Sequence, residues 1–372
     1  MKIDRRLINN FDWITFTLVT MLSLIGIATI FSATRSPISG EMPTYYIKQF
    51  YWLLFSLFAL VAFVSFDYIW LSRFSRMLYV FGLFMLALVF LHGKTGMGAQ
   101  RWLNLGVFSF QPSEVFKLIY VIALSRYLSE MQDKIRLISL LKIFLSLVSI
   151  PLLMIAKQPD LGTAMILLLV FLLLTATKGL HKKVVVLMVL LGLISIPFIG
   201  SIFWEGLKDY QKNRLVVFLE PQVDPSGIGY HITQSKVAIG SGKLIGKGYL
   251  KGTQGPFRFL PEKHTDFVFA VFAEEWGFTG SIFLLFLYFA FILRGLDTAR
   301  KAKDEFGRNL AIGISFMFTI YFFVNLGMTL GIMPVVGVPL PFMSYGGTAL
   351  LTNFIAAGIL INIRTRRFEL FY

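Results

Sequence analysis

Residues 13–30 read WITFTLVTMLSLIGIATI, an apolar stretch of 18 residues without a charged side chain. As an α-helix, this stretch is about 27 Å long, because each residue adds about 1.5 Å. The hydrocarbon core of a bilayer is about 30 Å thick, so the stretch predicts a helix that crosses a membrane. Residues 1–12 are basic, like the start of a signal peptide, but the apolar stretch exceeds the roughly 7 to 15 residues of a signal peptide's hydrophobic region. We therefore interpret it as a retained transmembrane helix.

Nine further apolar stretches follow along the chain, and together they predict the fold class. The ten stretches lie at about residues 13–30, 47–66, 77–91, 115–128, 140–156, 161–176, 184–204, 267–293, 310–332 and 348–363. The fourth is the most polar, because Lys117 and Arg126 interrupt it. The chain is 56% hydrophobic and only 15% charged, whereas soluble domains carry roughly 25% charged residues. We predict an all-α polytopic membrane protein that forms a single domain over residues 1–372.

The Lys and Arg residues are distributed unevenly between the two sides of this predicted bundle. An even number of helices places both termini on one side of the membrane, and basic residues concentrate in cytoplasmic loops. With a cytoplasmic N-terminus, 20 Lys and Arg residues fall in cytoplasmic segments and five in the short loops opposite. Both termini are therefore expected in the cytoplasm. Topology signals of this kind, together with basic residues that attract anionic headgroups, account for the net charge of +15. No motif indicates a nucleic-acid partner.

The composition also argues against two kinds of site. Without cysteine there is neither a disulfide framework nor a thiolate metal site. The four histidines, His92, His181, His231 and His264, are not spaced as metal ligands. The sequence therefore predicts no metal site.

One extracytoplasmic loop, residues 205–266 between the seventh and eighth predicted helices, is far longer than the other loops. Loops of more than about 12 to 15 residues are usually functional or disordered. This loop is rich in Tyr, Phe, Ile and Leu as well as Gly, so we expect it to fold onto the outer face. Short amphipathic helices at the membrane interface are predicted near residues 210–218 and 230–239.

The loop contains a glycine tract, residues 240–255, which reads GSGKLIGKGYLKGTQG. A phosphate-binding loop needs a glycine followed five residues later by Gly-Lys and then Ser or Thr, and this spacing is absent. The glycines instead predict a tight loop with positive φ angles. Basic side chains in and after the tract would attract an anionic group at the membrane surface.

The loop ends in LPEKHTDFVFAVFAEEWG, residues 260–277, where ionisable side chains are crowded. Thr265 or Asp266 is a suitable N-cap for the following helix. Asp266 is equally a candidate for chemistry, because Lys263 and His264 stand beside it at the mouth of a span. Glu274 and Glu275 follow two turns inside that span, and ionisable residues in a span indicate function by default.

A second polar cluster is predicted at the start of the fourth helix. Glu114 and Lys117 are three residues apart, so they share a helix face and can form an ion pair. Arg101 and Trp102 precede them on the same side of the membrane, and Asp160 lies in another short loop on that side. An internal ion pair and a functional site are both compatible with Glu114 and Lys117. Polar side chains thus gather at one face and one depth.

A third feature is the segment GIMPVVGVPLPFMSYGGTALLTNF, residues 331–354. Prolines and glycines at membrane depth indicate a broken or re-entrant segment, which is tolerated where it is buried in protein or lines a cavity. A cavity beside the polar clusters would suit a lipid substrate.

These motifs resemble those of the shape, elongation, division and sporulation (SEDS) family of bacterial polytopic membrane proteins. The resemblance covers essentially the whole chain, in order. It rests on GAQRWLNLG (98–106), FQPSE (110–114), QPDLGTA (158–164), LPEKHTDFVFAVFAEEWG (260–277) and PLPFMSYGGT (339–348). Within the family, the KGTQ segment at 251–254 and the VVGVPLPFMSYGGT segment at 335–348 are similar to the branch that serves cell elongation and rod shape.

The resemblance implies a ten-helix glycosyltransferase that polymerises lipid II into peptidoglycan strands on the outer face of the inner membrane. It also implies a partner within the elongation machinery, a class B penicillin-binding protein that crosslinks these strands. Asp266 matches the family's essential aspartate, which we predict to be catalytic. The residues predicted to bind substrate are Arg101, Trp102, Glu114, Lys117, Asp160, Lys263 and His264.

The implied reaction needs a base and a cationic site. A sugar 4-hydroxyl attacks the anomeric carbon of a second sugar, and polyprenyl diphosphate leaves. A carboxylate that accepts the hydroxyl proton contributes roughly 10² to 10⁴ in rate, and we assign this role to Asp266. Arg101 is the first candidate to stabilise the diphosphate, ahead of Lys117 and Lys263. A divalent cation such as Mg²⁺ or Mn²⁺ would share this task, although the sequence does not identify one.

Two other functions use the same apolar architecture. A lipid II flippase would require functional charges within the membrane and on both faces, whereas here they gather outside. A non-catalytic scaffold for a penicillin-binding protein would tolerate the loss of Asp266. Polymerisation of labelled lipid II by the purified chain separates these three possibilities.

Overall fold

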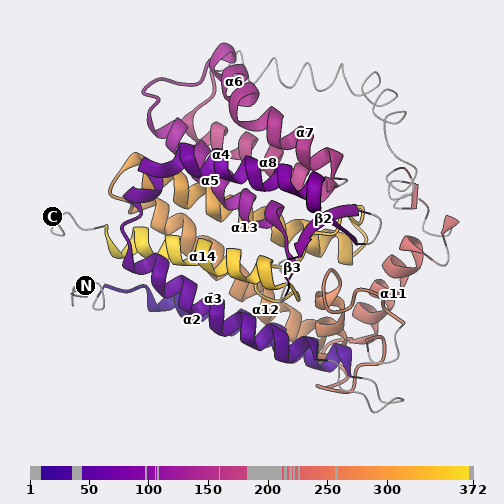
Figure 1. Ribbon diagram of the computed structural model, residues 1–372. Coiled ribbons are helices and arrows are strands. Elements are labelled where there is room, and N and C mark those ends of the chain that lie inside the picture. Colours follow the sequence, from indigo (N-terminus) through magenta and orange to yellow (C-terminus); the bar gives the residue numbers. More distant parts are fainter. Residues whose placement is uncertain are drawn as a thin grey trace.

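The computed structural model describes residues 10–35, 44–96, 99–104, 106, 109–158, 160–181, 227–255 and 259–367, with residues 212, 216–217, 220 and 223–224. Its helices lie side by side in one bundle (Figure 1). The elements are α2 (Trp13–Thr34), α3 (Tyr45–Ser65), α4 (Ile69–His92), β1 (Lys94–Gly96), β2 (Ala99–Asn104), β3 (Ser109–Phe110), α5 (Pro112–Ser129), α6 (Leu137–Ile143), η1 (Phe144–Val148), α7 (Ser149–Lys157), α8 (Leu161–Lys178), α11 (Ile228–Ser241), α12 (Val268–Arg300), α13 (Glu305–Thr329) and α14 (Gly347–Thr365). The predicted all-α polytopic class is confirmed, and the antiparallel sheet β1-β2-β3 in one connector is the feature that the sequence did not predict.

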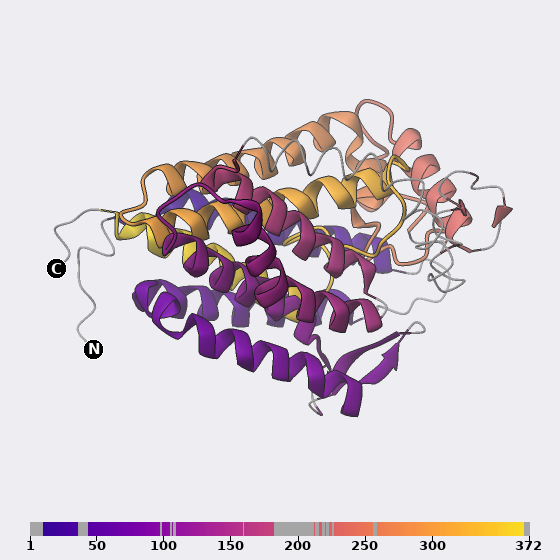
Figure 2. The ribbon, with the colours of Figure 1, turned by 90° about the horizontal axis from the view of Figure 1, so that it is seen from above.

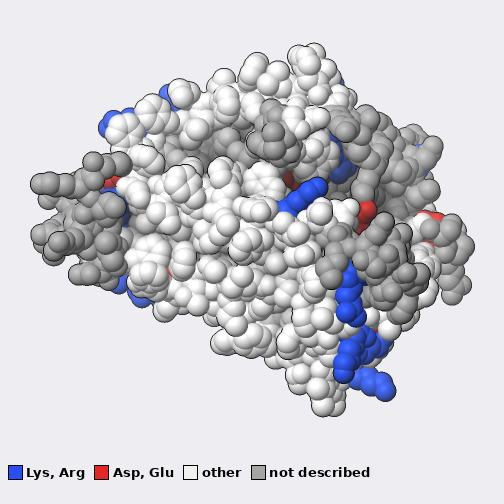
Figure 3. Space-filling view, turned by 60° about the horizontal axis from the view of Figure 1, so that its bottom comes forward, with Lys and Arg blue, Asp and Glu red and all other residues white. Residues whose placement is uncertain are grey.

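Eight helical segments within the described residues are long and apolar enough to cross a membrane, with α6, η1 and α7 together counting as one. The protein is therefore a multi-pass membrane protein. On the face shown in Figure 3, the middle of the molecule is almost uncharged, while Lys and Arg side chains gather toward its ends. The predicted helix at 184–204 lies outside the described residues, as does most of the predicted segment at 210–218. The segment predicted at 230–239 is helical and forms α11.

Helix α5 is the most polar of the predicted spans, and its position in the bundle explains why. Most of its side chains are buried, including Glu114 and Lys117. It packs against α4, α8, α13 and α14, so Glu114 and Lys117 face protein rather than lipid. Charged residues are tolerated at membrane depth where neighbouring helices supply partners.

The start of α2 and the end of α14 lie at the same end of the bundle, opposite the strands and α11 (Figures 1 and 2). An ion-pair cluster joins them. Asp12, the N-cap of α2, is 2.7 Å from Arg294 Nη2 and 3.6 Å from Arg364 Nε, and Arg364 is 2.8 Å from Asp297. Because Asp12 and Arg364 are almost completely buried, each charge depends on its partners for stabilisation.

The fifth span changes helix type in its middle, where η1 is a π-helical segment between α6 and α7. Pro151 lacks the backbone N–H that would bond the carbonyl of Leu147. The hydroxyl of Tyr79 on α4 donates to that carbonyl instead, at 2.9 Å. A π-helical insertion of this kind re-aligns the residues that follow, and here α7 leads directly to the polar loop before α8.

Candidate functional site

Asp266 occupies the turn that leads into α12. The N-cap of this helix is Phe267, without a side-chain cap, so the prediction that Thr265 or Asp266 caps it was wrong. The reason is local: the Thr265 hydroxyl donates to Glu262 Oε2 at 2.9 Å, and Phe267 N donates to the Glu262 carbonyl at 3.3 Å. The helix therefore starts at Val268, two residues after Asp266, whose side chain is half-buried.

The backbone of Asp266 is held by Asn325 on α13. The Asn325 amide nitrogen donates to the carbonyl of Asp266 at 3.0 Å and to the carbonyl of Val338 at 2.8 Å. Asn325 is completely buried, so these bonds form away from water. A Cβ atom on Gly337 would lie 3.5 Å from Asp266 Oδ2, and Gly337 has a φ of 73° that favours glycine. The carboxylate thus faces a residue without a side chain.

The segment between α13 and α14, residues 330–346, is not helical, which confirms the predicted broken segment. It wraps around the turn that carries Asp266. The Ser344 hydroxyl donates to the Thr265 carbonyl at 2.6 Å, and Tyr345 N donates to the His264 carbonyl at 2.8 Å. The rings of His264, Tyr45 and Tyr345 contact one another: the His264 centroid is 4.6 and 5.5 Å from those of Tyr45 and Tyr345, which are 5.2 Å apart.

Glu114 and Lys117 form the ion pair that their spacing predicts. Lys117 Nζ lies 2.7 Å from Glu114 Oε1, and both side chains are buried. Tyr321 on α13 completes the group, because its hydroxyl donates to Glu114 Oε2 at 3.5 Å. The Lys117 ammonium is also 4.6 Å from the centre of the Tyr321 ring, which is a cation–π distance.

Arg101 and Asp160 meet at the same end of the bundle. Arg101 Nη1 on β2 is 3.8 Å from Asp160 Oδ1, and its Nε donates to the carbonyl of Gln158 at 3.2 Å. Asp160 is the N-cap of α8 and accepts from Thr163 N at 3.3 Å. Ser113 at the start of α5 donates to Asp160 Oδ2 at 3.4 Å. The Arg101 side chain is 22% exposed, so it is bonded and still reachable.

Helix α13 connects the Glu114–Lys117 pair with the turn that carries Asp266. Tyr321 and Asn325 are four residues apart, so they share a helix face; the first contacts Glu114 and Lys117, and the second contacts Asp266. Trp102, the residue after Arg101 on β2, is half-buried. Lys263 donates its ammonium group to the carbonyl of Gly255. The predicted site residues are thus distributed over one end of the molecule.

Sequence reasoning missed Tyr321 and Asn325. Both lie within a predicted span, and a buried polar side chain in an apolar helix is a signal for function. Asn325 in the apolar run YFFVNLGM was detectable in this way. The partners of Asn325 could not be detected in the sequence, because the carbonyls of Asp266 and Val338 are 59 and 13 residues away along the chain.

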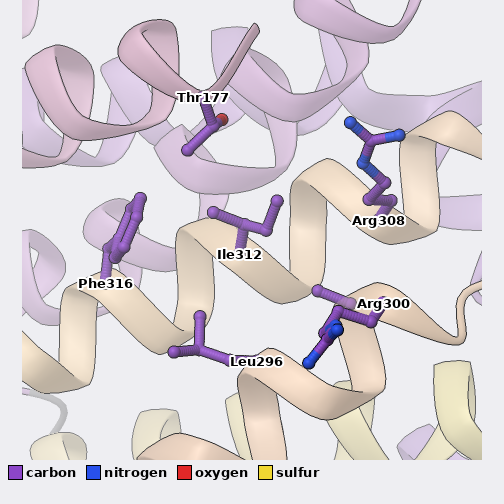
Figure 4. Close-up of a pocket in the computed structure, with 7 residues that line it drawn as sticks. Thr177, Leu296, Arg300, Arg308, Ile312 and Phe316 are labelled. Atoms are coloured by element: carbon purple, nitrogen blue, oxygen red, sulfur yellow. The ribbon is translucent and has the colours of Figure 1, made fainter.

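An apolar cavity lies elsewhere in the described part of the molecule. Its volume is about 280 Å³, and it is lined by residues of α8, α12 and α13: Thr177, Leu296, Ala299, Arg300, Arg308, Ile312 and Phe316. Figure 4 shows their side chains around it. These residues are near the last turns of α8 and α12, so the cavity is at the opposite end from Asp266. It contains none of the predicted site residues.

We expect Asn325→Leu to lower activity by at least about tenfold, because a shift of the Asp266 backbone misplaces its carboxylate. Stability should fall by about 1 to 3 kcal/mol, since two buried carbonyls lose their donor. A matched control is Asn309→Leu on the same helix, whose buried Nδ2 has no hydrogen-bond partner among the described residues. Turnover and thermal unfolding of both variants test this. Equal turnover for the two would contradict a role for Asn325.

The surroundings of His264 predict a pH dependence of stability. Burial lowers the pKa of His264 below its usual 6.5; the carboxylate of Glu262 raises it and the charge of Lys263 lowers it further. Because the folded state then binds fewer protons than the unfolded state, this contribution to stability is present above about pH 6.5 and is lost as the pH falls below it. Thermal unfolding between pH 5 and 8 should be flatter for His264→Gln than for wild type. Parallel curves would exclude this contribution.

Comparison with known proteins places the chain among bacterial membrane proteins. A family model described as "Cell cycle protein", for FtsW, RodA and SpoVE, matches residues 9–369. Peptidoglycan glycosyltransferase MrdB of Escherichia coli K12 is 45% identical over 291 residues, which are 78% of this chain and 77% of that protein. A chain from a structure of a peptidoglycan synthase complex, described as coordinating polymerisation and crosslinking, matches with a TM-score of 0.81 and 28% identity, over 96% of this chain and 99% of that one. The crystal structure of RodA from Thermus thermophilus matches with a TM-score of 0.70 and 26% identity, over 96% and 98%.

Proposed function

The chain belongs to the FtsW, RodA and SpoVE family, and from this premise we propose that it is a peptidoglycan glycosyltransferase that joins lipid II disaccharides into glycan strands. The similarity to MrdB and the elongation-type motifs support a role in cell elongation and rod shape. The observation that carries the proposal is the placement of Asp266, on a turn held by Asn325 and facing Gly337.

The proposed location is the bacterial inner membrane, with both termini in the cytoplasm and the site on the outer face. The count of 20 basic residues against five supports this orientation. The cluster of Asp12, Arg294 and Arg364 then marks the cytoplasmic end. Arg294 is near the C-terminal end of α12, whereas Asp266 precedes its N-terminal end, and the helix is 33 residues long. Residues 205–266 are proposed to form the outer loop of a single domain.

In the proposed reaction, Asp266 takes the proton from the 4-hydroxyl of one sugar as it attacks the anomeric carbon of the other. The polyprenyl diphosphate leaves with the bonding electron pair. An α-linked donor and a β-linked product require one inversion, so no protein nucleophile is needed. The partial exposure of Asp266 supports this role, because a base must reach the hydroxyl directly.

Charge on the departing diphosphate needs fixed cations. Arg101 is the leading candidate, since it is partly exposed and its partner Asp160 holds it in place. Lys117 is bound to Glu114 and Lys263 to the Gly255 carbonyl. We propose that the ion pair forms the floor of the substrate site. Trp102, Lys263 and His264 are proposed to line its outer edge.

A class B penicillin-binding protein is the proposed partner, because the product strands must be crosslinked. The matched chain from a peptidoglycan synthase complex supports this pairing.

The direct test uses the full-length chain with a transpeptidase-inactive partner and fluorescent lipid II. We expect polymer whose length grows with time. A flippase would move lipid II across vesicle bilayers without forming polymer, and a scaffold would do neither. Either of these outcomes would overturn the proposed activity.

A further inference from the structure

Helix α12 is interrupted at Gly277, where φ is 65° and ψ is −162°. A side chain is excluded there for two reasons. The positive φ favours glycine, and a Cβ atom would lie 2.3 Å from the backbone nitrogen of Gly246. The interruption leaves backbone groups on both sides of Gly277 without partners inside the helix, as at an ordinary helix end.

The glycine tract, residues 240–255, supplies the missing partners. In Figure 1 it lies beside the first part of α12. Four backbone hydrogen bonds join the two segments: Lys247 N to Glu274 O (3.0 Å), Gly248 N to Glu275 O (2.9 Å), Phe278 N to Lys243 O (2.9 Å) and Thr279 N to Leu244 O (3.0 Å). The break in α12 is therefore a docking site for the tract.

The carboxylate of Glu274 binds the second half of the tract. Lys247 Nζ is 2.6 Å from Glu274 Oε1, and the same oxygen accepts from the amide and hydroxyl of Thr253 at 2.8 and 2.7 Å. The amide of Gln254 donates to Oε2 at 3.1 Å. The Glu274 side chain is 0% exposed, so these donors replace water around a buried charge. A neutral side chain would offer weaker hydrogen bonds.

The tract in turn contacts the residues before Asp266. The amide of Leu260 donates to the carbonyl of Gln254 at 3.1 Å. The ammonium of Lys263 donates to the carbonyl of Gly255. Gln254 and Gly255 directly follow Thr253, so the position set by Glu274 is transmitted to a residue only three positions from Asp266.

Backbone strain marks the same segments. The non-glycine residues with positive φ among the described residues are Lys243, Leu250, Glu262 and Phe342. Two lie in the glycine tract, one lies four residues before Asp266, and one lies in the segment that wraps around it. Each strained residue is unfavourable by itself and persists only where surrounding contacts fix it. The site's geometry therefore depends on contacts such as those of Glu274.

We propose that Glu274 is a positioning residue for the general base: its carboxylate holds the glycine tract on the break in α12, and the tract holds residues 263–266 in the geometry needed for catalysis. Glu274 does not touch the substrate. The proposal rests on the proposed glycosyltransferase function, because it assigns Asp266 as the base.

The test compares Glu274→Gln and Lys247→Met in the full-length chain. Glu274→Gln should lower kcat about tenfold or more with KM within about twofold, since misplacing a catalytic group costs rate rather than binding. Lys247→Met should cost about threefold, because the donors from Thr253 and Gln254 remain. Glu305→Gln, in surface ion pairs far from the site, is the matched control. A KM effect without a kcat effect, or equal losses in both test variants, would overturn the proposal.

Hydrogen exchange supplies a readout that does not depend on activity. In Glu274→Gln, amide exchange should rise both in residues 243–255 and in residues 259–267, and should stay unchanged in Glu305→Gln. Exchange that rises only in the tract would overturn the coupling to Asp266. If Glu274→Gln does not fold, Thr253→Val removes one donor and should show the same pattern more weakly. Absence of polymer from wild type would reject the glycosyltransferase function, and the exchange data would still decide the coupling.

Discussion

Asp266→Asn is expected to abolish glycan polymerisation while leaving the fold and lipid II binding intact. Asparagine has nearly the same volume and keeps the Asp266 backbone carbonyl that Asn325 binds, so the turn before α12 should not change. It cannot accept the hydroxyl proton, and the loss of a general base costs roughly 10² to 10⁴ in rate. The measurement is polymerisation of fluorescent lipid II, with binding of lipid II measured separately.

The matched control is Asp224→Asn, at another aspartate in the segment that precedes α12. Asp224 accepts a hydrogen bond from Gly227 N at 2.9 Å, and this acceptor role survives in asparagine. We expect near wild-type polymerisation from this variant. Retained polymerisation by Asp266→Asn, or an equal loss in Asp224→Asn, would reject Asp266 as the base.

Lys117→Met is expected to destabilise the protein by about 3 to 5 kcal/mol, the cost of leaving one member of a buried ion pair without its partner. Glu114 would remain buried, with the Tyr321 hydroxyl at 3.5 Å as a weak donor. The measurement is thermal unfolding in detergent or nanodiscs. Arg126→Met is the control on the same helix, because its pair with Glu130 is exposed and such pairs contribute about 0 to 1 kcal/mol.

Two double variants separate structure from chemistry at this pair. Glu114→Gln with Lys117→Met removes both charges and should recover most of the lost stability. Exchange of the two residues, Glu114→Lys with Lys117→Glu, should recover polymerisation relative to either single change if the pair only forms the floor of the site. Stability that returns while polymerisation stays lost would instead assign Lys117 a direct contact with the diphosphate.

Most of the fold was predictable because the physics of membrane helices is local. Nine of the ten predicted stretches correspond to helical segments of the structure within the described residues. The largest error is at α4, which begins at Ile69 rather than near residue 77. Arg73 lies in its first turns, 5.2 Å from the centre of the Trp70 ring. A search for apolar runs places the start of the helix after such a charge. The helix itself can include the charge, because a long basic side chain can extend to a polar partner or to the membrane interface.

The sequence by itself determined the membrane-spanning architecture, the polar end of the bundle and the candidate residues in it, including Asp266 and the pairing of Glu114 with Lys117. Hydrophobic length, charge distribution and helical spacing are properties of neighbouring residues, so a single chain displays them. Only the tertiary structure decided that Asn325 binds the backbone of Asp266 and that Arg101 meets Asp160, because these contacts join residues 59 positions apart.

The break at Gly277 likewise could not be predicted from the sequence, although it lies within one helix. The sequence predicts a continuous span there, since a single glycine costs a helix only about 1 kcal/mol. The structure breaks it because the glycine tract supplies hydrogen bonds from 27 to 35 residues away and Glu274 receives donors from three tract residues. Local propensity can permit such a break, but only packing and hydrogen bonding between distant segments can make it the stable state.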